Sequence, residues 1–591
     1  MKRAIIFIKN NLFKVTLLIV VLLQLLIAFQ GFDVCDDGFV LTFYQQIFAN
    51  PESVEYNFLY WFSGVIGGLW YLLFEDGGIL WFRILGIIVN TLIFYLSYKL
   101  LKPYLKQEFL LLALVMALFV NDYGFLTYYH NHLTALMAVL IMYVLTKAVV
   151  KNNMGLYILS GTLLSINVFT RIPNLVLFSL VLVVPYAYYL RKEAVLNSIK
   201  PVLFIGIGSV LGFLLVFIAL SLLGQLEIMK NALLTINDLG NTKDSSHNFK
   251  SVFKAPYYNY KNIGIEFIKL LFIVVSLYFM RRILPQNKIA TALIFVFAVI
   301  VFALWFDTQN IYPIYGLCLM GSFSILLMKK INDEIKLISF LSLFTLITIT
   351  LGTGGGIRNS GYMAIYIGLP LFFYMINNFD LLVQKSKYLK INSHLTLSKR
   401  SVHLFLYAII VSFLLLKAYN ISQQSYFDDG NRFEKTYAIN SPLAKGIYTT
   451  ERRADIVNNL LINLNEFVEP DDYLMSYDNI PMVHFLTETK PYMYNPWVWI
   501  YDYNSFEKKL HKAESEIPVL PIVVQQKFET IHRFSQPIPD YMSTRKDNNN
   551  THSNERNAIM NAFLIRNDYQ IVWSNPYFNI YQSQRVRNQM N

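Results

Sequence analysis

Long apolar runs separated by short polar connections dominate the first 420 residues. A helix needs about 20 mostly apolar residues to cross the hydrocarbon core of a bilayer. One apolar stretch is too long for a single helix, and residues 171–174 (Arg-Ile-Pro-Asn) divide it into a hairpin. On this basis the sequence predicts thirteen membrane spans, near residues 13–31, 79–98, 108–120, 131–147, 155–170, 173–190, 202–224, 263–280, 289–306, 311–328, 336–352, 361–377 and 402–419.

The positions of basic residues predict the orientation of these spans. Lys and Arg concentrate in loops on the inner side of a membrane. With the N-terminus inside, Lys99, Lys102 and Lys106 fall inside, whereas the first outside loop, residues 32–78, contains no Lys or Arg. Another span at residues 58–74 would invert every later loop, so we interpret that segment as a re-entrant or interfacial helix. The first outside loop is therefore expected to hold two interfacial helices.

The composition changes near residue 421. Beyond it, helical segments (451–468 and 555–566) alternate with short apolar strands (473–477, 519–524, 569–573 and 578–581), and an Asn-rich stretch, residues 546–557, is typical of a loop. The sequence therefore predicts an α-helical polytopic membrane protein, with a transmembrane domain (residues 1–420) and an extracytoplasmic α/β domain (residues 421–591). The latter has no Gly-rich dinucleotide-binding motif, which favours a supporting or acceptor-binding role.

Composition and charge narrow the class of protein. The 591 residues are 55% hydrophobic with a mean hydropathy of +0.42, which is too apolar for a soluble protein. The net charge of +12 lies largely in short loops, and no nucleic-acid-binding module is evident. With only two cysteines, Cys35 and Cys318, a disulfide framework and a thiolate metal site are excluded.

Two adjacent carboxylates, Asp36 and Asp37, begin a predicted helix just past the first span. Apolar residues from Phe39 onwards follow a 3.6-residue period, with Thr42, Gln45, Gln46 and Ala49 on the opposite side. This pattern predicts an amphipathic helix on the membrane surface. The two carboxylates fit a helix cap and a catalytic role about equally well.

Other outside segments carry candidate binding groups. Asp122, His130 and His132 could hold a divalent metal, Mg²⁺ or Mn²⁺, although interfacial histidines are more often structural. The glycine-rich segment 352–361, which contains Gly355, Gly356 and Arg358, suits a phosphate but also a flexible turn.

The remaining basic candidates are Arg83, at the outside end of the second predicted span, and Lys243 and Lys250, in the long outside segment 225–262. Arg83 could equally snorkel to the interface. The long segment is expected to be a loop without clear structure, acting as a lid or as a plain connector. Charged residues are rare inside the spans, which disfavours an ion-coupled transporter.

The layout resembles the C-type glycosyltransferase superfamily, whose members are integral membrane enzymes that use polyprenyl-phosphate-linked sugars. The resemblance is carried by Asp36-Asp37-Gly38-Phe39 in the first outside loop, the interfacial helices, Arg83, and thirteen spans followed by an outside domain. Likeness to the protein mannosyltransferase and lipid A aminoarabinose transferase group implies that Asp36 is catalytic and Asp37 is the second acidic residue. The pattern of oligosaccharyltransferases instead selects Asp37, but their Asp-x-Asp and Trp-Trp-Asp motifs are absent.

The resemblance implies an inverting displacement in which an Asp carboxylate takes the acceptor's proton and a lipid phosphate leaves. The phosphate would be held by Arg358, Arg83, Gly355, Gly356, Lys243 and Lys250. The implied partners are a polyprenyl-phosphate-linked sugar donor, a lipid, glycan or protein acceptor, and membrane lipids. The implied location is a bacterial inner membrane, with a cytoplasmic N-terminus. The alternatives are a polysaccharide ligase or polymerase that uses a lipid diphosphate-linked glycan, a polysaccharide transporter or flippase, and a non-catalytic assembly protein.

Overall fold

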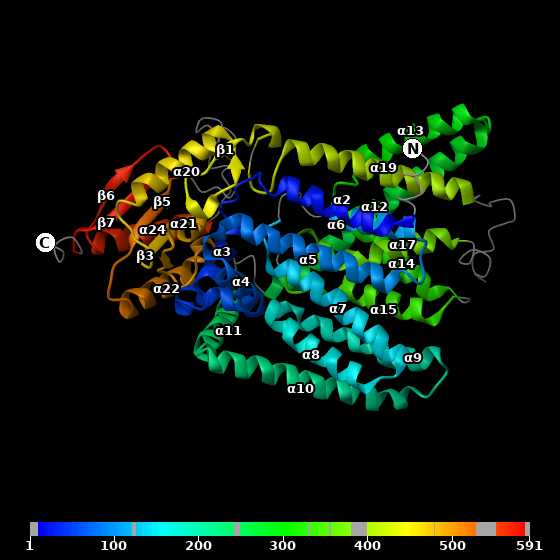
Figure 1. Ribbon diagram of the computed structural model, residues 1–591, viewed down its shortest axis with the longest axis horizontal. Coiled ribbons are helices and arrows are strands. Elements are labelled where there is room, and N and C mark those ends of the chain that lie inside the picture. The colour runs from blue at the N-terminus through cyan, green and yellow to red at the C-terminus, as the bar shows by residue number, and fades with distance from the viewer. Residues whose placement is uncertain are drawn as a thin grey trace.

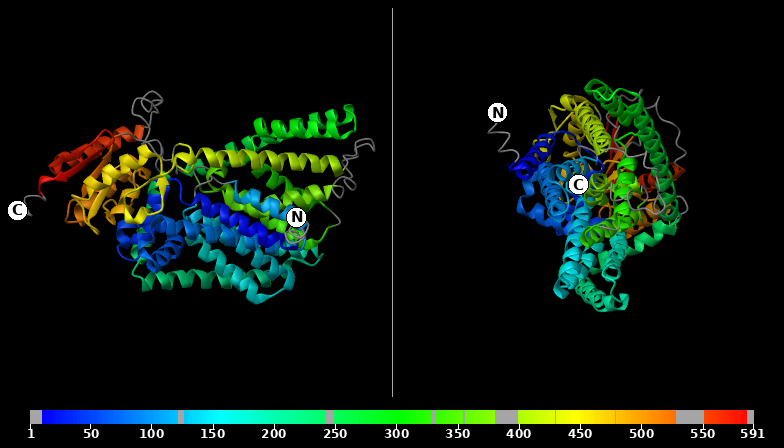
Figure 2. Two further views of the ribbon diagram at one scale, coloured as in Figure 1. Left: turned by 45° about the horizontal axis from the view of Figure 1, so that its top comes forward. Right: turned by 90° about the vertical axis from the view of Figure 1, so that its right-hand side faces the viewer.

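A bundle of helices carries a small α/β domain at one end (Figure 1). The computed structural model describes residues 10–120, 126–241, 249–328, 331–353, 356–379, 399–428, 430–477, 479–527 and 551–585. The helices of the bundle run mainly along the long axis of the molecule, and the left view of Figure 2 shows the same arrangement. The first loop after the N-terminal helix lies at the same end as the α/β domain.

Each of the thirteen apolar segments is helical over most of its length. The helices are α2 (Leu12–Ile27), α5 (Gly78–Leu101), α6 (Gln107–Leu118), α7 (His130–Lys151), α8 (Met154–Thr170), η3 with α9 (Ile172–Leu182 and Val183–Leu190), α10 (Ile199–Leu222), α12 (Phe249–Ile283), α13 (Lys288–Leu304), α14 (Ile311–Leu327), α15 (Asp333–Thr348), α16, η5 and α17 (Ile357–Ser360, Gly361–Ala364 and Ile365–Asn377) and α19 (Lys399–Gln423). Within the described residues, seven helical segments are long and apolar enough to cross a membrane. The chain is thus compatible with a helical membrane protein, and the number of spans stays a prediction.

Helices α8 and α10 illustrate how the bundle packs without a water-driven hydrophobic effect. A Cβ added to Gly161 would lie 2.0 Å from the carbonyl oxygen of Ile205, and one added to Gly208 would lie 1.9 Å from that of Ile158. The hydroxyl of Ser165 also donates to the Ser209 carbonyl. Small residues that allow close backbone contact and interhelical hydrogen bonds are typical of helix pairs in membranes. The outer face of α10 exposes Leu203, Leu214 and Phe217, as a lipid-facing helix does.

The first loop folds into α3 (Asp36–Gln46), η1 (Pro51–Tyr60), α4 (Trp61–Leu73) and η2 (Glu75–Gly77). The expectation that α3 lies on the membrane surface with a polar face in water is wrong. Thr42, Gln45 and Gln46 are all buried, because α21 of the C-terminal domain (Met482–Thr487) covers that face. The Gln45 side chain donates to the Phe485 carbonyl, which satisfies a polar group that sequence reasoning had assigned to solvent.

Helix α4 agrees with the interfacial interpretation of residues 58–74. Its 13 residues would extend only about 20 Å at 1.5 Å per residue. That is short of the hydrocarbon core, which is about 30 Å thick. Leu69, Leu72, Leu73 and Phe74 are exposed at its C-terminal end, while Gly64 and Gly67 pack against rings of α3. The helix thus presents one apolar tip and one packed face.

The segment 225–262 is helical, so the expected unstructured loop is wrong for most of its length. Helix α11 (Leu226–Asn241) begins directly after α10, and α12 begins at Phe249. Ile228, Met229 and Ala232 are buried on the side of α11 that packs against η1. Their spacing of one helical turn is an amphipathic signal that the sequence interpretation overlooked. Lys243 lies outside the described residues, as does the side chain of Lys250.

The C-terminal domain contains a five-stranded mixed sheet in the order β4-β3-β5-β7-β6. Strand β3 is parallel to β4 and β5, whereas β7 is antiparallel to β5 and β6. The elements are η6 (Arg432–Glu434), β1 (Tyr437–Ala438), η7 (Pro442–Ala444), β2 (Tyr448–Thr449), α20 (Glu451–Leu464), β3 (Tyr473–Tyr477), α21, β4 (Lys490–Pro491), η8 (Val498–Ile500), α22 (Tyr503–Glu516), β5 (Ile522–Gln526), α24 (Thr551–Arg566), β6 (Tyr569–Ser574) and β7 (Phe578–Ser583). The predicted strands and helices are present, but α24 starts at Thr551, inside the predicted Asn-rich loop.

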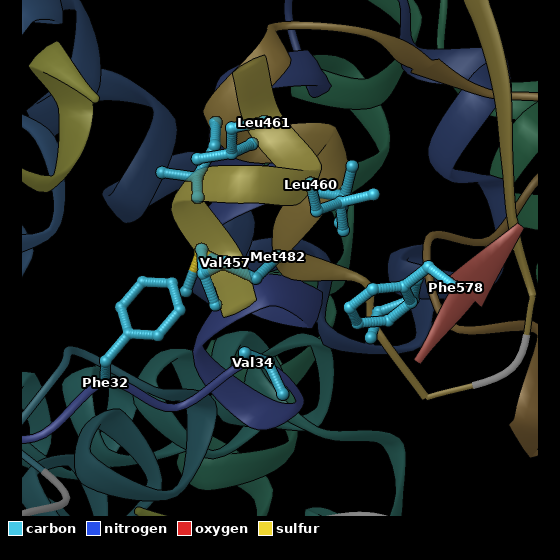
Figure 3. A pocket seen from close by; sticks show the side chains of 10 residues that line it. Phe32, Val34, Val457, Leu460, Leu461, Met482 and Phe578 are labelled. Atoms are coloured by element: carbon cyan, nitrogen blue, oxygen red, sulfur yellow. The ribbon is translucent and has the colours of Figure 1, made fainter. Parts of the chain in front are cut away.

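The C-terminal domain is docked directly onto the first loop. Figure 3 shows Phe32 and Val34 facing Val457, Leu460 and Met482 around an apolar cavity of about 20 Å³. Beside this apolar contact, a Cβ on Gly38 would lie 2.1 Å from the backbone nitrogen of Met482, so only glycine permits so close an approach.

Two buried ionic contacts reinforce the docking. Asp428 accepts from the Phe32 N–H at 2.8 Å and pairs with Arg453 at 3.0 Å, and both ionic side chains are fully buried. Farther along the loop, the buried Glu55 pairs with Lys509 and Lys512 of α22. The loop and the domain therefore share one folded interface.

Candidate active site

The first turn of α3 is capped by Asp33. Its carboxylate accepts from the backbone N–H groups of Cys35 at 2.8 Å and Asp37 at 2.9 Å. These are the orphan donors that a capping side chain satisfies. Burial raises the pKa of Asp33 well above its usual range, and the charges of Asp37 and Asp36 add to that rise. Because Asp33 supplies the cap, capping does not explain why two further carboxylates follow it.

Asp37 is sealed inside the protein. It is 3% exposed, and its carboxylate lies 3.5 Å from the guanidinium of Arg83. Burial raises the pKa of Asp37, while the charge of Arg83 and the hydroxyl of Thr127 lower it. The terminal nitrogens of Arg83 also donate to the carbonyls of Ala28 and Gly31. Arg83 therefore fixes the loop to the end of α2, and its terminal nitrogens already have partners other than a phosphate.

Asp36 differs from Asp37 because it keeps a partly exposed surface. Its carboxylate accepts a hydrogen bond from the Tyr426 hydroxyl at 2.5 Å. Desolvation raises the pKa of Asp36 from 3.8 to about 6, the Tyr426 hydrogen bond opposes that rise, and the charge of Asp37 adds to it. Burial and the negative charge of Asp36 raise the pKa of Tyr426 well above 10, so Tyr426 stays the proton donor. Asp36 is thus reachable, and it is ionised near neutral pH.

An aromatic cluster formed by Tyr60, Tyr129 and His130 lies near Asp36. The His130 ring stacks on Tyr60 with 3.9 Å between centroids and makes a tilted contact with Tyr129 at 3.8 Å. Tyr60 and Tyr129 both interact electrostatically with Asp36. The predicted candidates His130 and His132 are both buried, at 6% and 4% exposure. His130 is therefore an aromatic packing partner of the site.

Arg171 borders the same cluster. It is 4% exposed and interacts electrostatically with Tyr60, Tyr129 and Tyr362. One terminal nitrogen contacts Asn131 at 3.4 Å and the sulfur of Met363 at 3.8 Å. Within the described residues, its Nη2 has no hydrogen-bond partner and no carboxylate pairs with it. Burial lowers the pKa of Arg171, which expresses the cost of holding a cation there without a counter-ion.

The glycine-rich loop after α15 lies next to Arg171 in the fold. A Cβ on Gly352 would lie 3.0 Å from the side chain of Pro173, two residues beyond Arg171. Gly352 and Gly356 both have positive φ angles, of 78° and 53°, which glycine adopts without strain. Arg358 follows on α16 and is exposed. The structure thus brings the predicted phosphate loop and a second, buried arginine into one region.

Several predicted site residues cannot be placed. Asp122 and Gly355 lie outside the described residues, as does Lys243. Across the ranges that the structure describes, no three His, Cys, Asp or Glu side chains are grouped as a metal site would require. The predicted metal cluster around Asp122, His130 and His132 is therefore left as a prediction.

Sequence reasoning missed two residues of this site. Arg171 was interpreted only as part of a break between two helices, although a lone cation in an apolar stretch is itself a signal of function. Tyr426 lies 390 residues from Asp36 in the chain, and no local pattern connects the two. Comparison of the chain with models of known protein families and with curated proteins finds no match.

Proposed function

We propose that this protein is a membrane glycosyltransferase that moves a sugar from a polyprenyl-phosphate-linked donor to a lipid, glycan or protein acceptor. The observation that carries the proposal is that one site holds both a reachable carboxylate, Asp36, whose pKa is about 6, and a buried arginine, Arg171, for which the described residues supply no carboxylate partner. The two groups share Tyr60 and Tyr129 as electrostatic neighbours without pairing with each other. This separation suits a displacement reaction, because Asp36 can act on the attacking acceptor while Arg171 binds the departing phosphate.

Asp36 is the general base of the proposed reaction. Its carboxylate takes the proton of the acceptor's hydroxyl or amino group as that group attacks the anomeric carbon. A base is most effective when its pKa lies near the working pH, and the value of about 6 meets that condition better than an unperturbed Asp. Asp37 is the second acidic residue, and its charge raises the pKa of Asp36.

Arg171 stabilises the leaving group. As the new bond forms, the bond from the anomeric carbon to the phosphate oxygen breaks, and its electron pair stays on the lipid phosphate. A guanidinium offers a planar fork of donors that matches a phosphate, and in a water-poor site its charge is little screened. Arg358, which is exposed in the glycine-rich segment 352–361, would bind the phosphate of the entering donor. The apolar tip of α4 suits contact with the polyprenyl chain or the bilayer.

A donor with a lipid diphosphate is the second candidate, because Arg171 and Arg358 would suit two phosphates as well as one. Such a donor would make the protein a polysaccharide ligase or polymerase. The base would act in the same way, and the leaving group would be the lipid diphosphate. The chemical class of the donor therefore decides between the two functions.

The test is transfer of radiolabelled sugars from a panel of polyprenyl-phosphate and polyprenyl-diphosphate donors, using membranes that contain the full chain. We expect Asp36→Asn to lower transfer by about 10²- to 10⁴-fold, the usual contribution of a general base. Asp76→Asn, which changes an exposed carboxylate of the same loop, is the matched control and should leave transfer unchanged. Full transfer by Asp36→Asn would refute the assignment, and consumption of diphosphate donors alone would select the ligase.

A further inference from the structure

A second cavity lies at the end of the bundle away from the α/β domain. It is bounded by the start of α2, the end of α5 and the start of α6, and its volume is about 440 Å³. Ligand pockets in proteins commonly measure about 300 to 1,000 Å³. Lys14, Lys99 and Lys102 line it, each of them exposed to solvent on one side. This cavity shares no residue with the candidate active site.

The described residues supply no carboxylate that pairs with the lysines of this cavity. Across the described ranges, Lys14, Lys99 and Lys102 take part in no ion pair with a carboxylate. Glu108, on the first turn of α6, is exposed and does not pair with them. Three ammonium groups converging on one hollow repel each other, so an anion that entered it would gain from all three.

Aromatic rings give the cavity a fixed wall. Phe13 of α2 stacks on Tyr98 of α5 with 4.1 Å between centroids. The Lys99 ammonium lies 5.8 Å from the Tyr95 ring, and Lys102 lies 5.8 Å from the Tyr98 ring. Tyr95 is 40% exposed on the outer face of α5, where the helix meets its surroundings. An amphipathic ring at the rim and ammonium groups above it are typical of the headgroup level of a membrane.

From these features we propose that the cavity binds the phosphodiester headgroup of an anionic membrane lipid. The ammonium groups would pair with the phosphate, and the amide side chains of Asn10 and Gln107, which also line the cavity, would bind the polar part of the headgroup. The acyl chains would follow the apolar outer face of α5 past Tyr95 and Leu92. Basic pockets between membrane helices bind lipid headgroups in this way.

The experiment measures retention of phosphatidylglycerol by the purified full-length protein, using native mass spectrometry and titration of the lipid against phosphatidylcholine. We expect wild type to retain phosphatidylglycerol in preference to phosphatidylcholine. The triple variant Lys14→Gln/Lys99→Gln/Lys102→Gln should bind phosphatidylglycerol at least about tenfold more weakly, since each basic residue near a headgroup contributes to attraction. A triple Lys→Arg variant at the same positions keeps the charge and should retain the lipid.

The control removes the same charge at the same end of the bundle but outside the cavity, through Lys151→Gln/Lys192→Gln/Lys200→Gln, which are all exposed. It should retain phosphatidylglycerol within about twofold of wild type. Equal loss in the control, or no loss in the cavity variant, would overturn the proposal. Inorganic phosphate is the second probe. If it displaces the lipid at matched concentration, the cavity is a site for free phosphate and the lipid assignment is overturned.

Discussion

Removal of the Tyr426 hydroxyl should raise the pKa of Asp36 and move the acid limb of the pH–rate profile. In wild type the carboxylate becomes a base as the pH rises through about 6. The Tyr426 hydrogen bond favours the ionised form, so its loss in Tyr426→Phe must raise that pKa. A hydrogen bond to a charged group contributes about 1.5 to 3 kcal/mol, and one pKa unit corresponds to about 1.4 kcal/mol. Because Asp36 is partly exposed and water replaces part of the lost bond, we expect a shift of about one unit, to near pH 7.

The assay is kcat/KM for sugar transfer, measured from about pH 4 to pH 9 so that the free enzyme's base is reported. Tyr419→Phe, at an exposed tyrosine of α19, the helix that ends just before Tyr426, is the control and should keep the wild-type limb. An infrared band of the protonated carboxyl group, assigned by its absence in Asp36→Asn, measures the same pKa without substrate. A limb that stays in place, or that moves to lower pH, would refute the reasoning.

Four further predictions concern the candidate site and the residues that support it. Arg171→Gln should lower kcat/KM by about 10²- to 10³-fold, because it removes a hydrogen-bond donor to the charge that develops on the leaving phosphate. Arg358→Gln should lower kcat/KM much less, and titration of the sugar donor against both variants measures the difference. Asp36→Asn should raise the free energy of unfolding at pH 8 by roughly 1 to 2 kcal/mol, measured by thermal unfolding. The reason is that the raised pKa makes the ionised carboxylate destabilising above pH 6, so the variant should show no such increase near pH 4. Asp33→Ala should instead destabilise by about 1 kcal/mol, through loss of the cap, and an increase in Tm would contradict its capping role. Glu55→Gln should lower the free energy of unfolding by about 1 to 3 kcal/mol and make the junction between the first loop and the C-terminal domain more sensitive to limited proteolysis. Unchanged cleavage would show that the ion pairs of Glu55 do not stabilise this interface.

The apolar segments and the strands of the C-terminal domain were predictable because each depends on local periodicity and length. Thr42 and Gln46 were assigned to the wrong environment because their burial comes from α21, which is distant in sequence. A period of 3.6 shows which residues share a face, but it does not show what will cover that face. The same limitation applied to residues 225–262, where many lysines and tyrosines obscured the apolar spacing within α11.

The two carboxylates of the candidate site stood out in the sequence, whereas its buried cation, Arg171, did not. Sequence alone left Asp36 and Asp37 equivalent, and tertiary contacts separate them, since Arg83 seals one and Tyr426 reaches the other. Arg171 was hidden because it stands next to Ile172 and Pro173, whose effect on the helix gave a sufficient local explanation. What distinguishes Arg171 is its burial without a carboxylate partner among the described residues, and only the assembled helices create that environment.

The contact between Asp36 and Tyr426 also fixes when the site is completed. Tyr426 is synthesised 390 residues after Asp36, beyond the last predicted span. Until then the carboxylate has no tyrosine donor, and Gly38 has no α21 to pack against. A chain that is interrupted within the bundle therefore holds the aspartate but lacks the surroundings that set its proton affinity. The candidate site is therefore complete only after the segment that carries Tyr426 has been made and has folded against the first loop.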